Sequence, residues 1–189
     1  MIFVSTDFVF DGSQRQPYRE SDLPRPLSYY AQTKWMGEMA VAEAAKNYQV
    51  VRSAWLYGPG KRNFVTAICA ALEKDGPVNI VEDEVGNPTN VADLARGLIE
   101  ISHCGATGIF HYVNSGYCSR YEFGRAIAQL RGADPARIRP IRAADWPSPA
   151  ARPAWSVLDC GKLAQCGIAA PRPWHEALQE FLAGYGKGA

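Results

Sequence analysis

Short apolar runs alternate along the chain with longer segments that repeat apolar residues every three or four positions. The apolar runs are bounded by turn residues and predict strands, at 2–4, 49–53, 78–82 and 109–113. The longer segments predict helices, at 28–46, 63–73, 90–102, 119–132 and 173–184. Prolines between the last two helices predict irregular structure there. Strands that alternate with helices favour a parallel sheet covered by helices, so the pattern predicts an α/β fold.

The composition narrows the class of protein. The 189 residues are 47% hydrophobic and 21% charged, and 20 basic against 19 acidic side chains leave a net charge of +1. This balance is usual for a globular protein and gives no strong field toward nucleic acid or anionic lipid. No apolar run approaches the ~20 residues of a membrane helix, and the start of the chain does not resemble a signal peptide. We therefore expect a cytoplasmic protein that binds neither nucleic acid nor membrane.

The cysteines and histidines show no metal-ligand spacing. The five cysteines are an odd number without any Cys-x-x-Cys pair, and the three histidines lie far apart in the sequence. Cytosolic proteins usually keep such thiols reduced. We expect five reduced cysteines, structural histidines and no metal site.

Tyr30 and Lys34 have the most informative spacing in the sequence. Residues four apart on a helix project from one face, about one turn from each other. An ammonium beside a phenol favours the phenolate, so it makes the phenol a better proton donor near neutral pH. The same spacing occurs by chance in many helices, where it means only a surface aromatic beside a solvated lysine. A second feature is therefore needed to favour a catalytic interpretation.

Ser5, Thr6 and Asp7 supply that feature, because they directly follow the strand predicted at 2–4. Ligands of open parallel sheets bind at the carboxyl ends of the strands. A hydroxyl at this point can orient a substrate carbonyl toward the tyrosine. Side chains alternate along a strand, so Ser5 and Thr6 cannot both face the site. An ordinary turn, with Asp7 bonded to its own backbone, is the alternative.

Longer motifs resemble one enzyme family over nearly the whole chain and in the right order. They begin with Ser-Thr-Asp-Phe-Val-Phe-Asp-Gly at 5–12 and Tyr-Ala-Gln-Thr-Lys at 30–34. Later segments of the same kind lie at 51–58, 63–65, 86–89, 92–95 and 152–159. Together they resemble the extended short-chain dehydrogenase/reductases, and within them the dTDP-4-dehydrorhamnose reductase family. The fold implied is the C-terminal part of a Rossmann-like doubly wound parallel sheet with a small α/β substrate-binding lobe.

This resemblance implies reduction of the C4 keto group of dTDP-4-dehydro-L-rhamnose by NADPH or NADH. Thr6 corresponds to a hydrogen-bonding residue near the reacting oxygen, Tyr30 to the general acid and Lys34 to the residue that binds the nicotinamide ribose. Tyr30 and Lys34 are thus also the implied cofactor-binding residues. The implied substrate-binding residues are Asp7, Phe8, Trp55, Asn63, Asn87, Pro88, Thr89 and Arg152. The implied partner is the nucleotide sugar, and a homodimer is left open.

Three positions depart from the family pattern. Phe8 stands where the family usually has tyrosine, Glu84 where it commonly has glutamine, and Arg120 where an aromatic residue is common. The pair Asp7-Phe8 also differs from the sugar 4,6-dehydratases, which have Asp-Glu after the threonine. Dehydration is therefore disfavoured.

The resemblance also implies a unit that this sequence does not contain. The family opens with a glycine-rich GxxGxxG turn that binds the cofactor pyrophosphate, and the 189 residues hold no such turn followed by a helix. We therefore expect 1–75 to be the remnant of a Rossmann domain with the catalytic helix. We expect 76–189 to form mainly the substrate-binding lobe, with returns of the chain to the Rossmann part. Weak NADPH binding, an edge strand at 2–5 and a tendency to dimerise or aggregate would follow.

Two other functions stay open at this point. A non-catalytic relative that binds a nucleotide or a partner protein would fit the absent glycine-rich unit and Phe8. An epimerase would fit Tyr30 and Lys34 but the later motifs less well. Retention of Thr6 together with Tyr30 and Lys34 favours the reductase.

Overall fold

Three parallel strands form the sheet of the first lobe. The computed structural model describes residues 1–146 and 150–185. The strands are β1 (Ile2–Thr6), β2 (Gln49–Ser53) and β7 (Gly108–His111), in the order β1-β2-β7. Among the described residues β1 pairs only with β2, so it is the edge strand that the sequence predicts. Its side chains Ile2 and Val4 are each 37% exposed.

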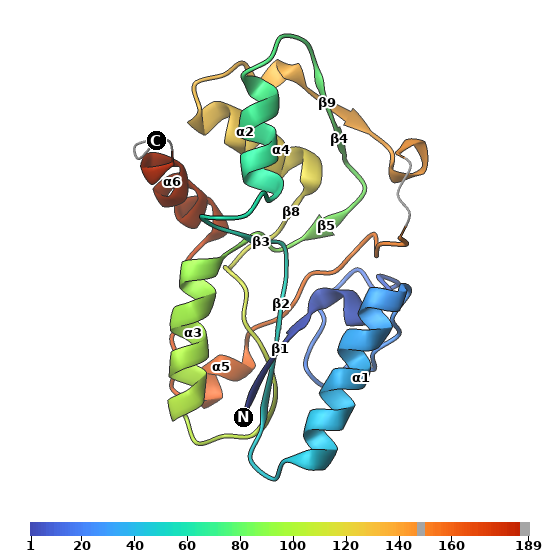
Figure 1. The fold of residues 1–189 in the computed structure, drawn as a ribbon, viewed down its shortest axis with the longest axis vertical. Helices are drawn as coiled ribbons and strands as arrows, with labels where there is room; N and C mark the ends of the chain where they lie inside the picture. Colours follow the sequence, from blue (N-terminus) through green and yellow to red (C-terminus); the bar gives the residue numbers. More distant parts are fainter. Residues whose placement is uncertain (147–149, 186–189) are drawn as a thin grey trace.

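Helices lie on both sides of these strands. They are α1 (Tyr29–Ala44), α3 (Val91–His103) and the short α5 (Lys162–Gln165). α1 packs against β1, α3 against β2 and α5 against β7, with α1 and α3 on opposite sides of the strands in Figure 1. α1 begins where it does because Ser28 Oγ accepts a hydrogen bond from the Ala31 N–H at 3.3 Å.

The second lobe stands above the first in Figure 1. Its helices are α2 (Phe64–Leu72), α4 (Arg120–Leu130) and α6 (Trp174–Gly184), and its parallel strands are β4 (Val78–Val81) and β9 (Ile138–Ile141). α4 begins with a capping box. The Ser119 hydroxyl accepts from the Glu122 backbone N–H at 3.0 Å, and the Glu122 carboxylate accepts from the Ser119 N–H at 2.7 Å.

Short elements join the two lobes. β3 (Leu56–Tyr57) pairs in parallel with β6 (Thr89–Asn90), and β5 (Val85–Gly86) pairs antiparallel with β8 (Cys118–Ser119). Single turns of 3-10 helix are η1 (Asp7–Val9), η2 (Pro135–Arg137) and η3 (Ala143–Asp145). η1 directly follows β1, so it continues the chain from the sheet toward the second lobe.

The structure confirms the strands and helices predicted from the sequence, each to within two residues at either end. It corrects the proline-rich stretch after residue 132, because β9 runs through Pro140 and pairs with β4. Proline lacks an amide hydrogen and is tolerated in a strand with a free edge. The next proline, Pro147, lies outside the described residues. β4 itself does not join the sheet of β1, β2 and β7.

Buried apolar side chains gather in three clusters. One fills the second lobe around Phe123, and another lies between the sheet and α3 around Phe110. The third holds the segment after β1, where the rings of Phe10 and Tyr18 stack with centres 4.1 Å apart. The Tyr18 N–H also donates to the Val157 carbonyl oxygen at 2.8 Å. This cluster therefore fixes η1 and the loop after it against the later part of the chain.

The described helices include none that is long and apolar enough to cross a membrane. Within 1–146 and 150–185, no group of three or more His, Cys, Asp or Glu side chains could hold a metal ion. The five cysteines are free thiols.

Candidate active site

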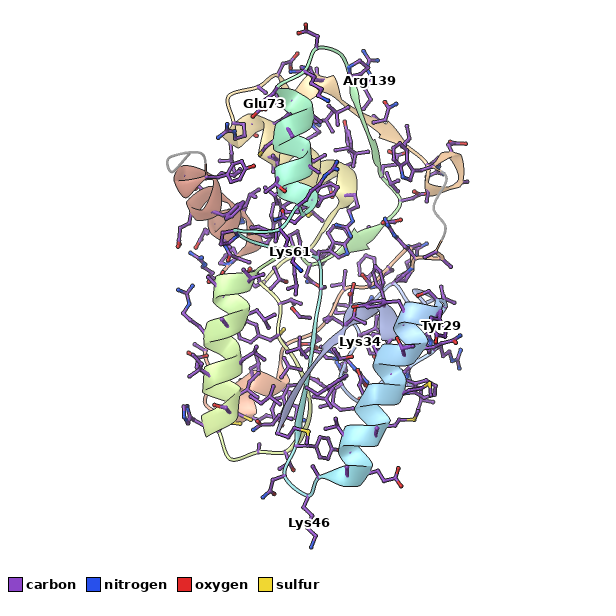
Figure 2. The ribbon with its side chains drawn as sticks, in the orientation of Figure 1. Tyr29, Lys34, Lys46, Lys61, Glu73 and Arg139 are labelled. Carbon is purple, nitrogen blue, oxygen red and sulfur yellow. The ribbon has the colours of Figure 1, made fainter. Side chains whose placement is uncertain are left out.

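The first turns of α1 carry Tyr30 and Lys34. Lys34 turns toward β1 (Figure 2), where its Nζ donates to the Val4 carbonyl oxygen at 2.6 Å and lies 4.3 Å from the centre of the Phe3 ring. Burial lowers the pKa of Lys34, and the Glu38 carboxylate acts in the opposite direction. The Tyr30 side chain is 54% exposed. The lysine is therefore fixed against the edge strand, while the phenol is open to a ligand.

A buried ion pair fixes α1 on the sheet. Glu38, one turn after Lys34, accepts two hydrogen bonds from Arg52 of β2, at 3.0 Å from Nε and 2.7 Å from Nη2. The Ser5 hydroxyl donates to the same carboxylate at 2.5 Å. All three of these side chains are buried. Ser5 therefore faces α1, and because strand side chains alternate, Thr6 faces the other way.

Thr6, rather than Asp7, closes the turn after β1. Its Oγ1 accepts from the Phe8 backbone N–H at 3.3 Å and donates to Asp7 Oδ1 at 3.0 Å. Asp7 is 2% exposed, and its Oδ2 has no hydrogen-bond partner among the described residues. Burial raises the pKa of Asp7 to about 6, although nearby hydroxyls and the Arg120 guanidinium lower it. A buried carboxyl group with one free oxygen is suited to bind a ligand hydroxyl.

A cleft of about 560 Å³ lies between η1 and the second lobe. Its walls include Phe8, Phe64, Ile68, Glu84, Arg120 and Arg152. Two of these, Phe8 and Arg152, are predicted substrate-binding residues. α1 packs against η1, and Thr6 and Asp7 directly precede Phe8, so the predicted catalytic groups border the first-lobe end of this cleft.

Trp55 lies between the lobes in a strained backbone conformation. Its φ of 45° makes it the one non-glycine residue of the described chain in the left-handed region. Such a conformation costs about 1–3 kcal/mol and occurs mostly at binding and catalytic sites. The ring lies so close to Gly86 that a side-chain carbon there would be 2.6 Å from it. The Arg120 guanidinium stacks on the ring, 3.5 Å from its centre. This position is consistent with Trp55 as a wall of the sugar pocket.

Four predicted binding residues are not among those that line the cleft. Asn63 caps α2, which carries Phe64 into the cleft wall. Asn87 is buried and ties two backbone segments together, through Nδ2 at 2.8 Å and Oδ1 at 2.9 Å. Pro88 and Thr89 are buried beside it. The described contacts of Asn63 and Asn87 are all within the chain, so the binding role of these four residues stays a prediction.

Glu84, Arg120 and Ser156 are site residues that the sequence reasoning passed over. Glu84 and Arg120 stand out in the sequence only as departures from the family pattern, and the fold is needed to show that both line the cleft. Ser156 is 1% exposed and its hydroxyl lowers the pKa of Asp7. Its place in the segment 152–159, which resembles the family, was the available signal.

Comparison with known proteins places the chain. A family model described as the RmlD substrate binding domain matches residues 1–186. The chain belongs to this family. The dTDP-4-dehydrorhamnose reductase of Mycolicibacterium smegmatis is 40% identical over 186 residues, which cover 97% of this chain and 57% of that protein. The spore coat polysaccharide biosynthesis protein SpsK of Bacillus subtilis is 38% identical over 182 residues, which cover 96% and 63%. The chain thus spans less than two thirds of the length of these curated relatives.

Solved structures of similar proteins share the fold. The dTDP-4-dehydrorhamnose reductase from Bacillus anthracis, crystallised with NADP, matches with a TM-score of 0.91 at 31% identity, over 96% of this chain and 64% of that one. The corresponding protein from Clostridium acetobutylicum matches with a TM-score of 0.91 at 36% identity, over the same shares of the two chains. These matches confirm the predicted Rossmann-like α/β fold and the family resemblance.

The groups on α1 fit the ribose end of a nicotinamide cofactor, which the family implies. One N–H of the Lys34 ammonium is used by Val4, and the other two make no hydrogen bond with the described residues. Ribose hydroxyls can accept from such free donors. The exposed Tyr30 phenol stands one helical turn away. The donor set of this chain therefore matches the part of the cofactor that carries the reacting ring.

Proposed function

We propose that this chain supplies the catalytic and substrate-binding parts of a nucleotide-sugar 4-ketoreductase, which reduces the C4 keto group of dTDP-4-dehydro-L-rhamnose. The observation that carries the proposal is the placement of Tyr30 and Lys34 on one face of α1, fixed beside the end of β1. We further propose that 1–75 belong to the cofactor-binding domain and that 76–189 form mainly the substrate-binding lobe. The names of the similar proteins support the same chemistry.

The residues of this chain account for the movement of the proton. The Tyr30 hydroxyl donates a proton to the C4 oxygen as the carbonyl becomes an alcohol. When bound, NADPH or NADH supplies the hydride that C4 receives. Lys34 keeps a positive charge one turn away, which favours the phenolate left after the transfer. Tyr30 is 54% exposed, so the phenolate regains its proton from water. One hydride and one proton balance the new C–H and O–H bonds.

Three residues around the end of β1 are suited to hold the sugar. Thr6 Oγ1, which donates to Asp7 in the free chain, can turn to the C4 oxygen of a bound ketone. The free Oδ2 of Asp7 can accept from a sugar hydroxyl. The ring of Trp55 offers a flat apolar face for the C–H groups of the sugar. Phe8 and Arg152 extend this surface into the cleft.

The test is a nicotinamide absorbance assay with dTDP-4-dehydro-L-rhamnose and NADPH. Because the chain spans less than two thirds of its relatives, it is assayed alone and joined to the part of the M. smegmatis protein that it does not match. Tyr30→Phe should lower turnover by roughly 100- to 10,000-fold, the usual contribution of a general acid. Tyr29→Phe is the matched control, because this neighbouring tyrosine is 81% exposed and should leave turnover unchanged.

Equal turnover by Tyr30→Phe and the unsubstituted protein would overturn the assignment of Tyr30. A different result, no turnover in either form of the chain together with a stable stoichiometric protein partner, would favour a non-catalytic member of the family.

A further inference from the structure

Arg120 is a largely buried cation in the wall of the cleft. It is the first residue of α4, and its backbone N–H donates to the Glu84 carbonyl oxygen at 3.1 Å. Its guanidinium carbon lies 3.5 Å from the centre of the Trp55 ring and 5.1 Å from the centre of the Phe64 ring. The side chain is 15% exposed. Stacking on Trp55 fixes the plane of the guanidinium, so its N–H groups point sideways from the ring.

The hydrogen-bond donors of this guanidinium are not satisfied within the described part of the chain. The guanidinium makes no hydrogen bond with a described residue, and its ion pair with Glu84 Oε2 spans 3.7 Å from Nε. Burial lowers the pKa of Arg120 to about 10, while Glu84 and Asp7 raise it, so the group is a cation at neutral pH. Burying a charge without hydrogen bonds is costly. The geometry therefore leaves room for the acceptor atoms of a ligand.

A second guanidinium, that of Arg152, lines the same cleft and repels Arg120. Glu84 is the one carboxylate among the described residues in the cleft wall, so two cations there face one anion. Guanidinium groups match carboxylates and phosphates with paired hydrogen bonds. A carboxylate offers one anionic group, whereas a diphosphate offers two adjacent ones. Two guanidiniums in one cleft therefore fit a diphosphate better.

We propose that Arg120 and Arg152 bind the diphosphate of the nucleotide sugar, and that Arg120 leaves Glu84 when phosphoryl oxygens replace it. The proposal rests on the proposed function and adds the residues that select a diphosphate-linked substrate. Arg120 interacts electrostatically with both Asp7 and Arg152. The sugar then lies on the Asp7 side of Arg120, and the nucleotide extends past Arg152.

The test is isothermal titration of the 189-residue chain with dTDP, with thymidine and thymidine monophosphate as ligands that lack the diphosphate. Arg120→Gln should weaken dTDP binding by roughly 10- to 100-fold, the usual effect of losing hydrogen bonds to a charged group. The same substitution should change thymidine binding much less. Arg142→Gln is the matched control, because Arg142 is 65% exposed, pairs with Glu82 and is not in the cleft wall.

Glu84→Gln tests the exchange of partners and keeps the proposal testable if Arg120→Gln fails to fold. Removing the competing carboxylate should tighten dTDP binding severalfold and make the affinity more sensitive to salt. Unchanged dTDP affinity in folded Arg120→Gln, weaker binding in Glu84→Gln, or no dTDP binding by the unsubstituted chain would each overturn the proposal. None of these results bears on the proton transfer by Tyr30, which the absorbance assay tests separately.

Discussion

The ion pair between Glu38 and Arg52 holds the catalytic helix at its height above the sheet. The side chains are 4% and 1% exposed, and the Ser5 hydroxyl supplies a third hydrogen bond to the carboxylate. Glu38→Gln keeps the shape of the side chain but leaves the Arg52 charge buried without its counter-charge. Removing one partner of such a pair costs about 3–5 kcal/mol. Since domains are commonly stable by about 5–15 kcal/mol, we expect a large loss of stability.

The free energy of unfolding is measured by urea titration with circular dichroism at pH 7. Glu43→Gln is the matched control, because Glu43 is exposed on the same helix and should change stability by less than about 0.5 kcal/mol. Replacing both charges, as Glu38→Leu with Arg52→Met, should cost less than Glu38→Gln alone, because no unpaired charge is left. A loss for Glu38→Gln no larger than that of the Glu43 control would refute the reasoning.

Two further predictions concern stability. His111 is fully buried, and burial together with Arg52 lowers its pKa from 6.5 to about 3. The unfolded chain therefore binds a proton that the folded chain does not, so stability should fall as the pH drops from 6.5 toward 3, by up to about 5 kcal/mol. His111→Gln should flatten this slope in urea titrations at several pH values, and an unchanged slope would contradict the assignment. Gly97→Ala should lower the melting temperature, because the added methyl group would overlap the Tyr112 ring. Gly184→Ala, in open space on α6, should instead stabilise by up to about 1 kcal/mol, and equal effects of the two substitutions would contradict the packing described.

The sequence was sufficient where local pattern decides the structure. Apolar runs and capping residues located β1, α1 and α4, because these signals lie within a few residues of one another. The four-residue spacing of Tyr30 and Lys34 on a helix also follows from local geometry. The strand alternation that separates Ser5 from Thr6 follows in the same way.

Long-range contacts could not be predicted in this way. Glu38 lies on a polar stretch of α1, and its burial depends on Arg52 from β2. β9 passes through Pro140, which reads locally as a breaker, and its partner β4 is distant in the sequence. Asn87 lies in a segment that resembles a binding loop, whereas its amide joins two backbone segments.

The position of Arg120 shows the same limit most clearly. As a residue at the start of a predicted helix it indicates no function. Its stacking on Trp55 and its unsatisfied donors depend on two other segments of the chain. The resemblance to a family showed only that an arginine here is unusual.

A crystal structure of the chain with the reduced product, dTDP-L-rhamnose, would test the central claim most directly. The account predicts that the C4 oxygen of the sugar lies within about 2.6–3.2 Å of the Tyr30 hydroxyl, the reach of a proton-donating hydrogen bond. A sugar bound in another cavity, or with its C4 oxygen beyond hydrogen-bond reach of Tyr30, would contradict it.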